Sequence, residues 1–221
     1  MEISCKTIQG LTNLKQRRNS QDTYSIENYE GITSICVCDG AGFSDYGALA
    51  AKEVSKTVSK FMIDSYYCWD CKCIKRKISD SIECKLLKIA KKEGIEYANL
   101  ASTIIGLCLK DNGEINMLHL GDGQVFAKRR FSDEIYYLSS AQNGIFKNQT
   151  YLTGSDQFPQ NLRVYDSFKD PGYEYLYIMT DGGNELLFHP DKEQIQFQDI
   201  DALFDNNMFL KDDCTVIKIK L

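Results

Sequence analysis

The sequence predicts an α+β fold in which a pair of helices packs on mainly antiparallel sheets. Three runs with the composition of strands precede any helical pattern. Two amphipathic runs then follow one another, and most of the remaining chain is again short strand-like runs separated by turn residues. Strand runs that surround one helical pair are typical of α+β architecture.

The length and composition fit one domain. We expect it to span residues 1–221, because a chain of this length can bury a sizeable core. Its 26 basic and 31 acidic residues give a net charge of -5, which argues against a nucleic-acid partner. The first residues lack the apolar core of a signal peptide and no run reaches membrane-spanning length. We therefore expect a cytoplasmic protein without a membrane partner.

The first half of the chain contains three predicted strands and two predicted helices. Residues 2–8 and 22–28 read as strands on either side of a basic loop, and residues 32–39 form an apolar run that ends at Asp39-Gly40. A helix should begin after a cap at Ser44 or Asp45. A second helix, with lysines on its other face, should end at Gly94 and pair with the first.

The second half returns to strands. Four of them, read as a meander with an Asp-Gly turn at Asp122-Gly123, are expected at residues 102–109, 115–120, 124–129 and 135–138. Residues 139–161 look irregular. Further elements are expected as strands at 162–168, 173–179 and 214–219, a short helix after Gly183, and a helix at 192–204.

Nine cysteines are many for this chain, and we interpret most of them as reduced thiols. Several lie in strand-like runs beside Ile and Val, where a buried thiol behaves as a small apolar side chain. Cys68, Cys71 and Cys73, with Cys84 further along, leave a zinc site open as an alternative. The second ligand pair lacks the usual spacing, so we expect no zinc.

Carboxylates at strand ends are the candidate functional residues. Asp39 and Asp181 both follow apolar strands, and Asp212 precedes the last strand. Brought together, such groups would form an all-oxygen site for hard divalent cations. Asp122 has a simpler reading, in which Asp-Gly only turns the chain between two strands.

Six short motifs follow one another along the chain. They are Arg17 with Asn19-Ser20-Gln21-Asp22; Asp39-Gly40-Ala41-Gly42 with Gly47-Ala48; Ala101-Ser102-Thr103; Gly121-Asp122-Gly123; Thr180-Asp181-Gly182; and Asp212-Asp213-Cys214-Thr215-Val216. In this order they resemble the metal-dependent Ser/Thr protein phosphatases of type 2C, in a shorter bacterial branch. The terminal motif of that family has Asp-Asn where this chain has Asp212-Asp213.

The resemblance implies a four-layer αββα sandwich, with two mainly antiparallel sheets flanked by helix pairs. It also implies hydrolysis of phosphoserine and phosphothreonine by water activated between two Mn²⁺ or Mg²⁺ ions. By this resemblance, Asp39 would bridge the two ions, and the Gly40 carbonyl would bind one of them. Asp181 and Asp212 would bind the other ion, and Asp122 could bind a third ion more loosely. Asp22 would support the site, and Arg17 would bind the substrate phosphate.

Two departures from the family pattern bear on activity. Gln21 replaces a metal-binding Glu and keeps an oxygen ligand without its charge. Ala41 replaces a histidine that could protonate the leaving oxygen, so water or the substrate would supply that proton. The alternative is therefore a non-catalytic member that binds a phosphoprotein or regulates a partner. Phosphatases with an aspartyl nucleophile are excluded, because they need an Asp where Ala41 stands.

The resemblance also implies partners in signalling. The expected substrate is a phosphoprotein, and the opposing enzyme would be a cognate Ser/Thr kinase. We expect the protein to act as a monomer.

Overall fold

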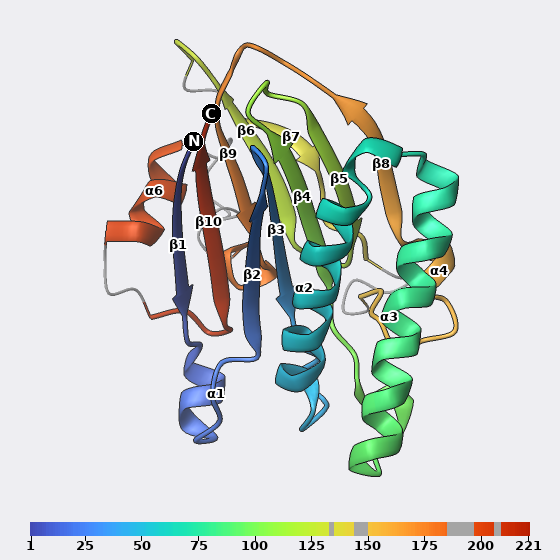
Figure 1. Ribbon diagram of the computed structural model, residues 1–221. Helices are drawn as coiled ribbons and strands as arrows, with labels where there is room; N and C mark the ends of the chain where they lie inside the picture. The colour runs from blue at the N-terminus through green and yellow to red at the C-terminus, as the bar shows by residue number, and fades with distance from the viewer. Residues whose placement is uncertain (133–134, 144–149, 185–196, 206–208) are drawn as a thin grey trace.

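The computed structural model describes residues 1–132, 135–143, 150–184, 197–205 and 209–221. It contains two five-stranded sheets, with strand orders β1-β10-β9-β6-β7 and β2-β3-β4-β5-β8, and neighbouring strands pair antiparallel throughout (Figure 1). The strands are β1 (Glu2–Ile8), β2 (Asp22–Tyr29), β3 (Ile32–Asp39), β4 (Ile104–Lys110), β5 (Ile115–Leu120), β6 (Gln124–Arg129), β7 (Ile135–Ser139), β8 (Arg163–Phe168), β9 (Tyr173–Met179) and β10 (Cys214–Lys220). The α-helices are α1 (Leu11–Lys15), α2 (Gly47–Asp64), α3 (Cys71–Glu93), α4 (Phe158–Asn161) and α6 (Phe197–Asp205).

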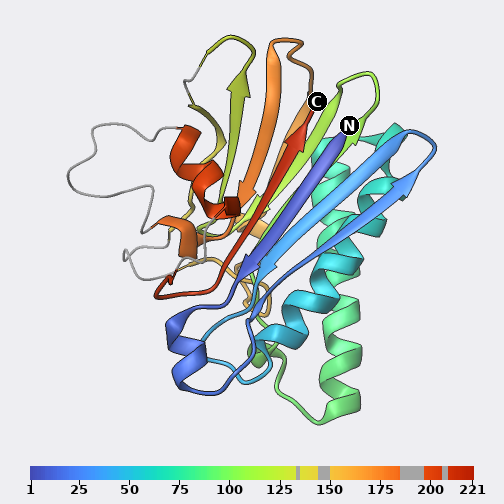
Figure 2. The ribbon, with the colours of Figure 1, turned by 90° about the vertical axis from the view of Figure 1, so that its left-hand side faces the viewer.

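The molecule is layered, with helices outside and two sheets inside (Figure 2). One apolar cluster fills the space between the sheets, a second lies under α2 and α3, and a third lies under α6. The α+β sandwich expected from the sequence is therefore confirmed. Its outer layer beside β9 and β10 contains α6. The short helix expected after Gly183, and the start of the one expected at 192–204, lie outside the described residues.

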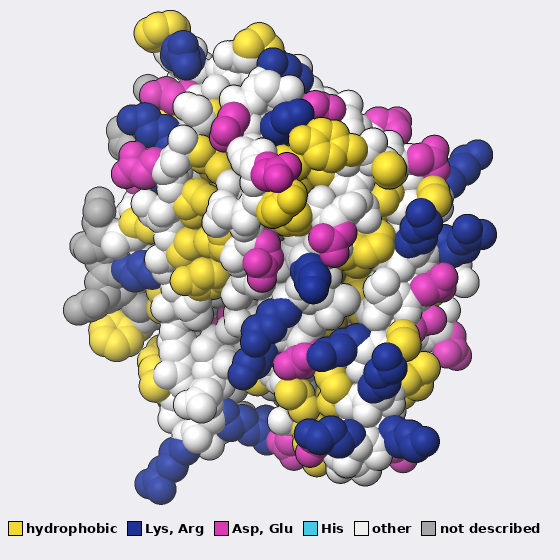
Figure 3. Space-filling model, viewed as in Figure 1, with side chains coloured by type: hydrophobic (Ala, Val, Ile, Leu, Met, Phe, Trp, Pro, Cys, Tyr) yellow, Lys and Arg dark blue, Asp and Glu magenta, His cyan; other side chains and the backbone are white. Residues whose placement is uncertain are grey.

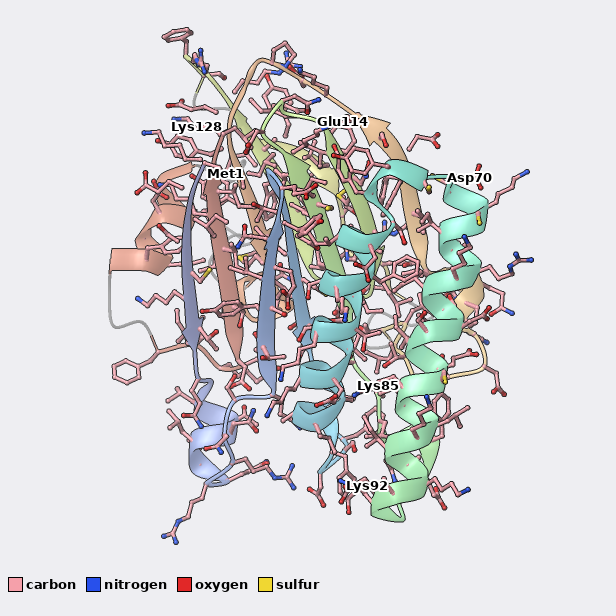
Figure 4. The ribbon with its side chains drawn as sticks, viewed as in Figure 1. Met1, Asp70, Lys85, Lys92, Glu114 and Lys128 are labelled. Carbon is pink, nitrogen blue, oxygen red and sulfur yellow. The ribbon has the colours of Figure 1, made fainter. Side chains whose placement is uncertain are left out.

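The helical pair forms as the sequence predicts, with one local difference. Asp70 caps α3 by accepting a hydrogen bond from the Cys73 amide at 2.8 Å, and Gly94 ends it in the left-handed conformation. Figure 4 labels Asp70 at the start of this helix and Lys92 near its end. The cap predicted for α2 is wrong, because the N-cap is Tyr46 and no side chain caps it.

The lysine-rich face of α3 points outward. Most apolar residues of α3 are buried in the core, although Leu87 is exposed, and most of the basic residues of the helix are exposed. Figure 3 shows Lys and Arg side chains gathering over this part of the surface. None of the helices that the structure describes is long and apolar enough to cross a membrane.

The chain crosses between the two sheets at Gly121-Asp122-Gly123, which corrects the predicted meander. β4 and β5 form a hairpin in one sheet, whereas β6 and β7 form a hairpin in the other. Gly121 takes a φ of 114°, a conformation that favours glycine. Asp122-Gly123 is therefore not a hairpin turn. It lies in the segment that connects one sheet to the other.

Two short helices lie in segments that were expected to form a basic loop, before β2, and an irregular region, at 139–161. α1 lies in the basic loop after β1, and α4 precedes β8. Helices this short give little periodic signal, because they span little more than one turn.

The cysteines are free thiols in the described chain. In the turn between α2 and α3, the Cys71 thiol donates to the Asp166 carboxylate at 3.0 Å. The indole of Trp69 donates to the Tyr165 carbonyl at 2.8 Å, so this turn is fastened to β8 by hydrogen bonds.

Candidate metal centre

Three carboxylates converge where strands of both sheets end. Asp39 ends β3, Asp122 lies in the crossing segment, and Asp181 follows β9. One carboxylate oxygen from each lies within 4.8 Å of the others. We call these residues the carboxylate cluster. Its donors are all oxygen, as hard divalent cations require.

Burial, together with the charges of neighbouring carboxylates, raises the pKa values of all three cluster members. Burial, followed by the charges of Asp122, Asp212 and Asp22, raises the pKa of Asp181 to about 7. Burial and then the charges of Asp22 and Asp181 raise the pKa of Asp39 well above its usual range. Burial also raises the pKa of Asp122. Without a cation, the ionised cluster is therefore unfavourable, and a divalent cation would neutralise that repulsion.

The backbone of Asp39 is fixed by Thr103. The Asp39 amide donates to the Thr103 hydroxyl at 2.9 Å, and the Thr103 amide donates to the Asp39 carbonyl at 2.8 Å. Next to it, Gly40 packs so closely that an added Cβ would lie 2.3 Å from the Gly47 carbonyl. The glycine therefore allows the first residue of α2, Gly47, to pack directly against the residue after the carboxylate.

Asp22 stands opposite Asp39 in the register of β2 and β3 and is buried. One of its oxygens accepts a hydrogen bond from the Thr180 hydroxyl at 2.6 Å, and the other has no partner among the described residues. Burial raises its pKa to about 6. Asp22 thus lies beside the cluster.

The two acidic residues before β10 have different surroundings. Asp212 is exposed, and its charge acts on Asp181 and Asp122, although it is not in the group of three within 4.8 Å. Asp213 is buried and accepts hydrogen bonds from the amides of Gly10 and Gln21 and from the Asn13 side chain. Of the two, Asp212 has the freer carboxylate near the cluster.

Gln21 is buried beside the glycine-rich turn after Asp39. Its side-chain amide donates to the Ser44 carbonyl at 3.0 Å, and its backbone carbonyl accepts from the Gly40 amide at 3.1 Å. Gln21 is therefore next to Gly40, while its amide nitrogen is engaged with the turn.

Arg17 is exposed at the end of α1 and has a left-handed backbone, with φ of 56°. Its neighbour Arg18 forms an ion pair with Asp45 at 2.8 Å. This pair ties the loop that carries Arg17 to the turn that follows Asp39, although both side chains are substantially exposed.

His119 does not join the carboxylate cluster. It is buried in β5, where its Nδ1 lies 2.5 Å from the Ser139 hydroxyl and 2.8 Å from the Arg163 guanidinium. Burial, followed by the Arg163 charge, lowers the pKa of His119 to about 3. The imidazole is thus neutral at physiological pH and is a packed strand residue.

Three threonines support the carboxylates of the site, and the sequence alone did not predict these contacts. Thr103 holds Asp39, Thr180 holds Asp22, and the Thr150 hydroxyl donates to the Asp122 carboxylate. Thr103 and Thr180 were visible only as parts of motifs. The sequence does not indicate which carboxylate a threonine hydroxyl will contact in the fold.

Comparisons with known proteins indicate the family and the fold of the chain. The sequence matches the protein phosphatase 2C family over residues 9–208. A sequence search of curated proteins gives no match. Among solved structures, Stp1, a serine/threonine phosphatase from Staphylococcus aureus, has a TM-score of 0.67 at 18% identity, covering 100% of this chain and 95% of that one. A bacterial serine phosphatase has a TM-score of 0.66 at 19% identity, covering 99% and 96%.

RsbX, solved in complex with magnesium, has a TM-score of 0.60 at 16% identity, covering 98% of this chain and 92% of that one. At these identities the solved structures establish the fold alone. The family match extends over most of the sequence and includes the segments that supply Asp39, Asp122 and Asp181. The chain therefore belongs to the protein phosphatase 2C family.

Proposed function

We propose that the protein is a metal-dependent phosphatase that hydrolyses phosphoserine and phosphothreonine in proteins, using two Mn²⁺ or Mg²⁺ ions. The observation that carries this proposal is the convergence of Asp39, Asp122 and Asp181 within 4.8 Å in a chain of this family. Bound divalent cations would lower the pKa of a water molecule and neutralise charge on the phosphoryl group.

Each residue of the site would have a separate role in binding the ions or the substrate. Asp39, with its backbone held by Thr103, would bridge the two ions, and the Gly40 carbonyl would bind one of them. Asp181 and Asp212 would hold the other ion, and Asp122 a looser third. Asp22 would keep Asp39 in place from the neighbouring strand. Arg17 would donate two parallel hydrogen bonds to the substrate phosphate.

Phosphate release from a phosphothreonine peptide tests the proposal. We expect release with Mn²⁺ and with Mg²⁺, and none after EDTA treatment. A phosphotyrosine peptide of the same sequence serves as the control for substrate class. Absence of metal-dependent release from the phosphothreonine peptide would overturn the proposal.

A non-catalytic role is the second candidate, and the surroundings of Gln21 favour it. Its amide is bonded to the Ser44 carbonyl, and it brings no charge to the site. A protein of this kind could bind a phosphoprotein without hydrolysing it. Calorimetric titration with Mn²⁺ separates the two candidates, because the enzyme requires two ions and a binding module does not.

Gln21→Glu is expected to lower the Mn²⁺ concentration needed for half-maximal activity by about five-fold, or roughly 1 kcal/mol. Glutamate cannot donate to the Ser44 carbonyl, and its charge would be attracted to the cations. The wild type should favour Mn²⁺ over Mg²⁺, because Mn²⁺ accepts imperfect neutral-ligand sites more readily. Metal-dependence curves of the two proteins measure both effects.

Gln16→Glu is the matched control, since it adds the same charge at an exposed position on the end of α1. It should leave the half-saturating concentration within about two-fold of wild type. An unchanged or raised value in Gln21→Glu would show that this side chain points away from the ions.

A further inference from the structure

Asp213 is bound on both carboxylate oxygens by the loop of residues 10–21, which we call the Arg17 loop. One oxygen accepts the Gly10 amide, and the other accepts both the Gln21 amide and the Asn13 side chain, each at 2.7 Å. Asp213 as a whole residue is 3% exposed. It therefore holds the beginning, the middle and the end of a single loop.

The loop is also packed directly against the chain that leads into β10. The Leu11 amide donates to the Leu210 carbonyl at 2.9 Å, and the Thr12 amide donates to the Lys211 carbonyl at 3.1 Å. An added Cβ on Gly10 would lie 2.6 Å from the Asp213 nitrogen. The start of the loop is therefore packed tightly against the segment that contains Asp213.

Asn13 connects the Asp213 carboxylate to the backbone beside Arg17 and Arg18. Its side chain donates to Asp213, while its backbone carbonyl accepts the Arg18 amide at 2.9 Å. Arg17 immediately precedes that bond and has the left-handed φ of 56°. Two hydrogen bonds thus separate the Asp213 carboxylate from the turn that presents Arg17.

The other end of the loop leads to the carboxylates. The Gln21 amide donates to Asp213, and the Gln21 carbonyl accepts the amide of Gly40, the residue after Asp39. Asp213 is itself adjacent to Asp212, whose carboxylate accepts the Asp213 amide at 2.9 Å. The same side chain is therefore connected to Arg17 and to two segments of the metal centre.

These contacts require a carboxylate. Three N–H donors meet two oxygens, and an asparagine has only one acceptor oxygen, so its NH₂ group would face a donor in either orientation. The family motif has Asn at this position, and this chain has Asp. Both oxygens of this carboxylate are hydrogen-bonded to the Arg17 loop.

We propose that Asp213 is a positioning residue that fixes Arg17 relative to the metal centre and thereby sets the affinity for the substrate phosphate. This inference rests on the proposed phosphatase function. Small displacements of a phosphate clamp weaken binding and alignment, because the fork of an arginine must match two phosphate oxygens. Asp213 acts through Arg17 and does not touch the substrate.

A double-mutant cycle tests the proposal with phosphothreonine peptide and Mn²⁺. Asp213→Asn should raise KM about ten-fold and change kcat by less than about three-fold, because it disturbs substrate positioning. In an Arg17→Ala background, the same substitution should change KM by less than about two-fold, because the residue through which it acts is gone. A full additional loss in that background would overturn the proposal.

Hydrogen exchange of the full-length protein provides a readout independent of activity. Asp213→Asn should speed exchange of the amides at residues 11–18, while the amides of β3 and α3 keep their protection. Unchanged exchange in the loop would overturn the proposal even if KM rises. If the wild type releases no phosphate, the proposed function fails, and this measurement still decides whether Asp213 fixes the loop.

Asn13→Ala provides a second variant in case Asp213→Asn does not fold. It removes one of the three donors and leaves the carboxylate in place. We expect the same pattern in KM and in loop exchange, with a smaller change. Thr12→Ala is the matched control, because its exposed hydroxyl bonds to the Lys211 carbonyl rather than to Asp213. Equal effects of the two variants would contradict the proposal.

Discussion

Asp39→Asn is expected to reduce turnover of a phosphothreonine peptide by more than about 100-fold, or roughly 2.7 kcal/mol of barrier, while preserving the fold. The substitution keeps the shape of the side chain and removes the charge that would bridge the two ions. Thr103 holds the backbone of this residue through two hydrogen bonds that do not involve the carboxylate. Steady-state kinetics with saturating Mn²⁺ measures the loss.

Without metal, the Asp39→Asn variant should be more stable than the wild-type protein. Burial and the charges of Asp22 and Asp181 raise the pKa of Asp39, so the neutral amide relieves an unfavourable charge. Asp80→Asn, at an exposed position on α3, is the control and should change neither quantity. If Asp39→Asn retains more than about a tenth of wild-type turnover, roughly 1.4 kcal/mol, its bridging role is wrong.

The metal-free protein should become more stable as the pH falls from 8 to 5. Burial raises the pKa of Asp181 to about 7 and that of Asp22 to about 6, both above the value of an unfolded aspartate near 3.9. In this window the folded state binds more protons than the unfolded state, so the free energy of unfolding falls as pH rises. After screening, we expect a gain of about 2 kcal/mol on acidification, or about 5 °C in Tm.

Thermal unfolding in EDTA across this pH range measures the effect. Asp181→Asn should remove much of the pH dependence, whereas Asp64→Asn, at the exposed end of α2, should preserve it. Saturating Mn²⁺ should stabilise the protein most at high pH, because the cations compete with protons for the same carboxylates. A metal-free protein that loses stability steadily from pH 8 to pH 5 would contradict the cause assigned to these pKa values.

Elements with a strong local pattern were predictable from the sequence. The run that became β3 is mostly apolar and ends at Asp39-Gly40, and its strand is buried along nearly its whole length. The repeat of apolar residues in α3 and the glycine that ends it specify both the helix and its C-cap. Here local sequence and tertiary packing favour the same structure.

Features determined by long-range contacts were not predictable in the same way. Asp122-Gly123 has the sequence of a hairpin turn, and only the assignment of β5 and β6 to different sheets shows that the chain crosses there. Asp212 is exposed near the cluster, whereas Asp213 is buried among amides of residues 10–21. Nothing in the local sequence of this pair predicts the difference. Their separation depends on contacts between opposite ends of the sequence.

The pairing of β1 with β10 has a consequence for the order of folding. Glu2 pairs with Lys220 and Ile8 with Cys214, so the first strand acquires this neighbour only after the last strand is available. Closing so long a segment is entropically costly, and contacts of this separation slow folding. During synthesis, the sheet containing β2 to β5 can form around its helical pair well before the sheet that needs β10. Cation binding that depends on Asp212 would therefore come after the sheet of β2 to β5 has formed.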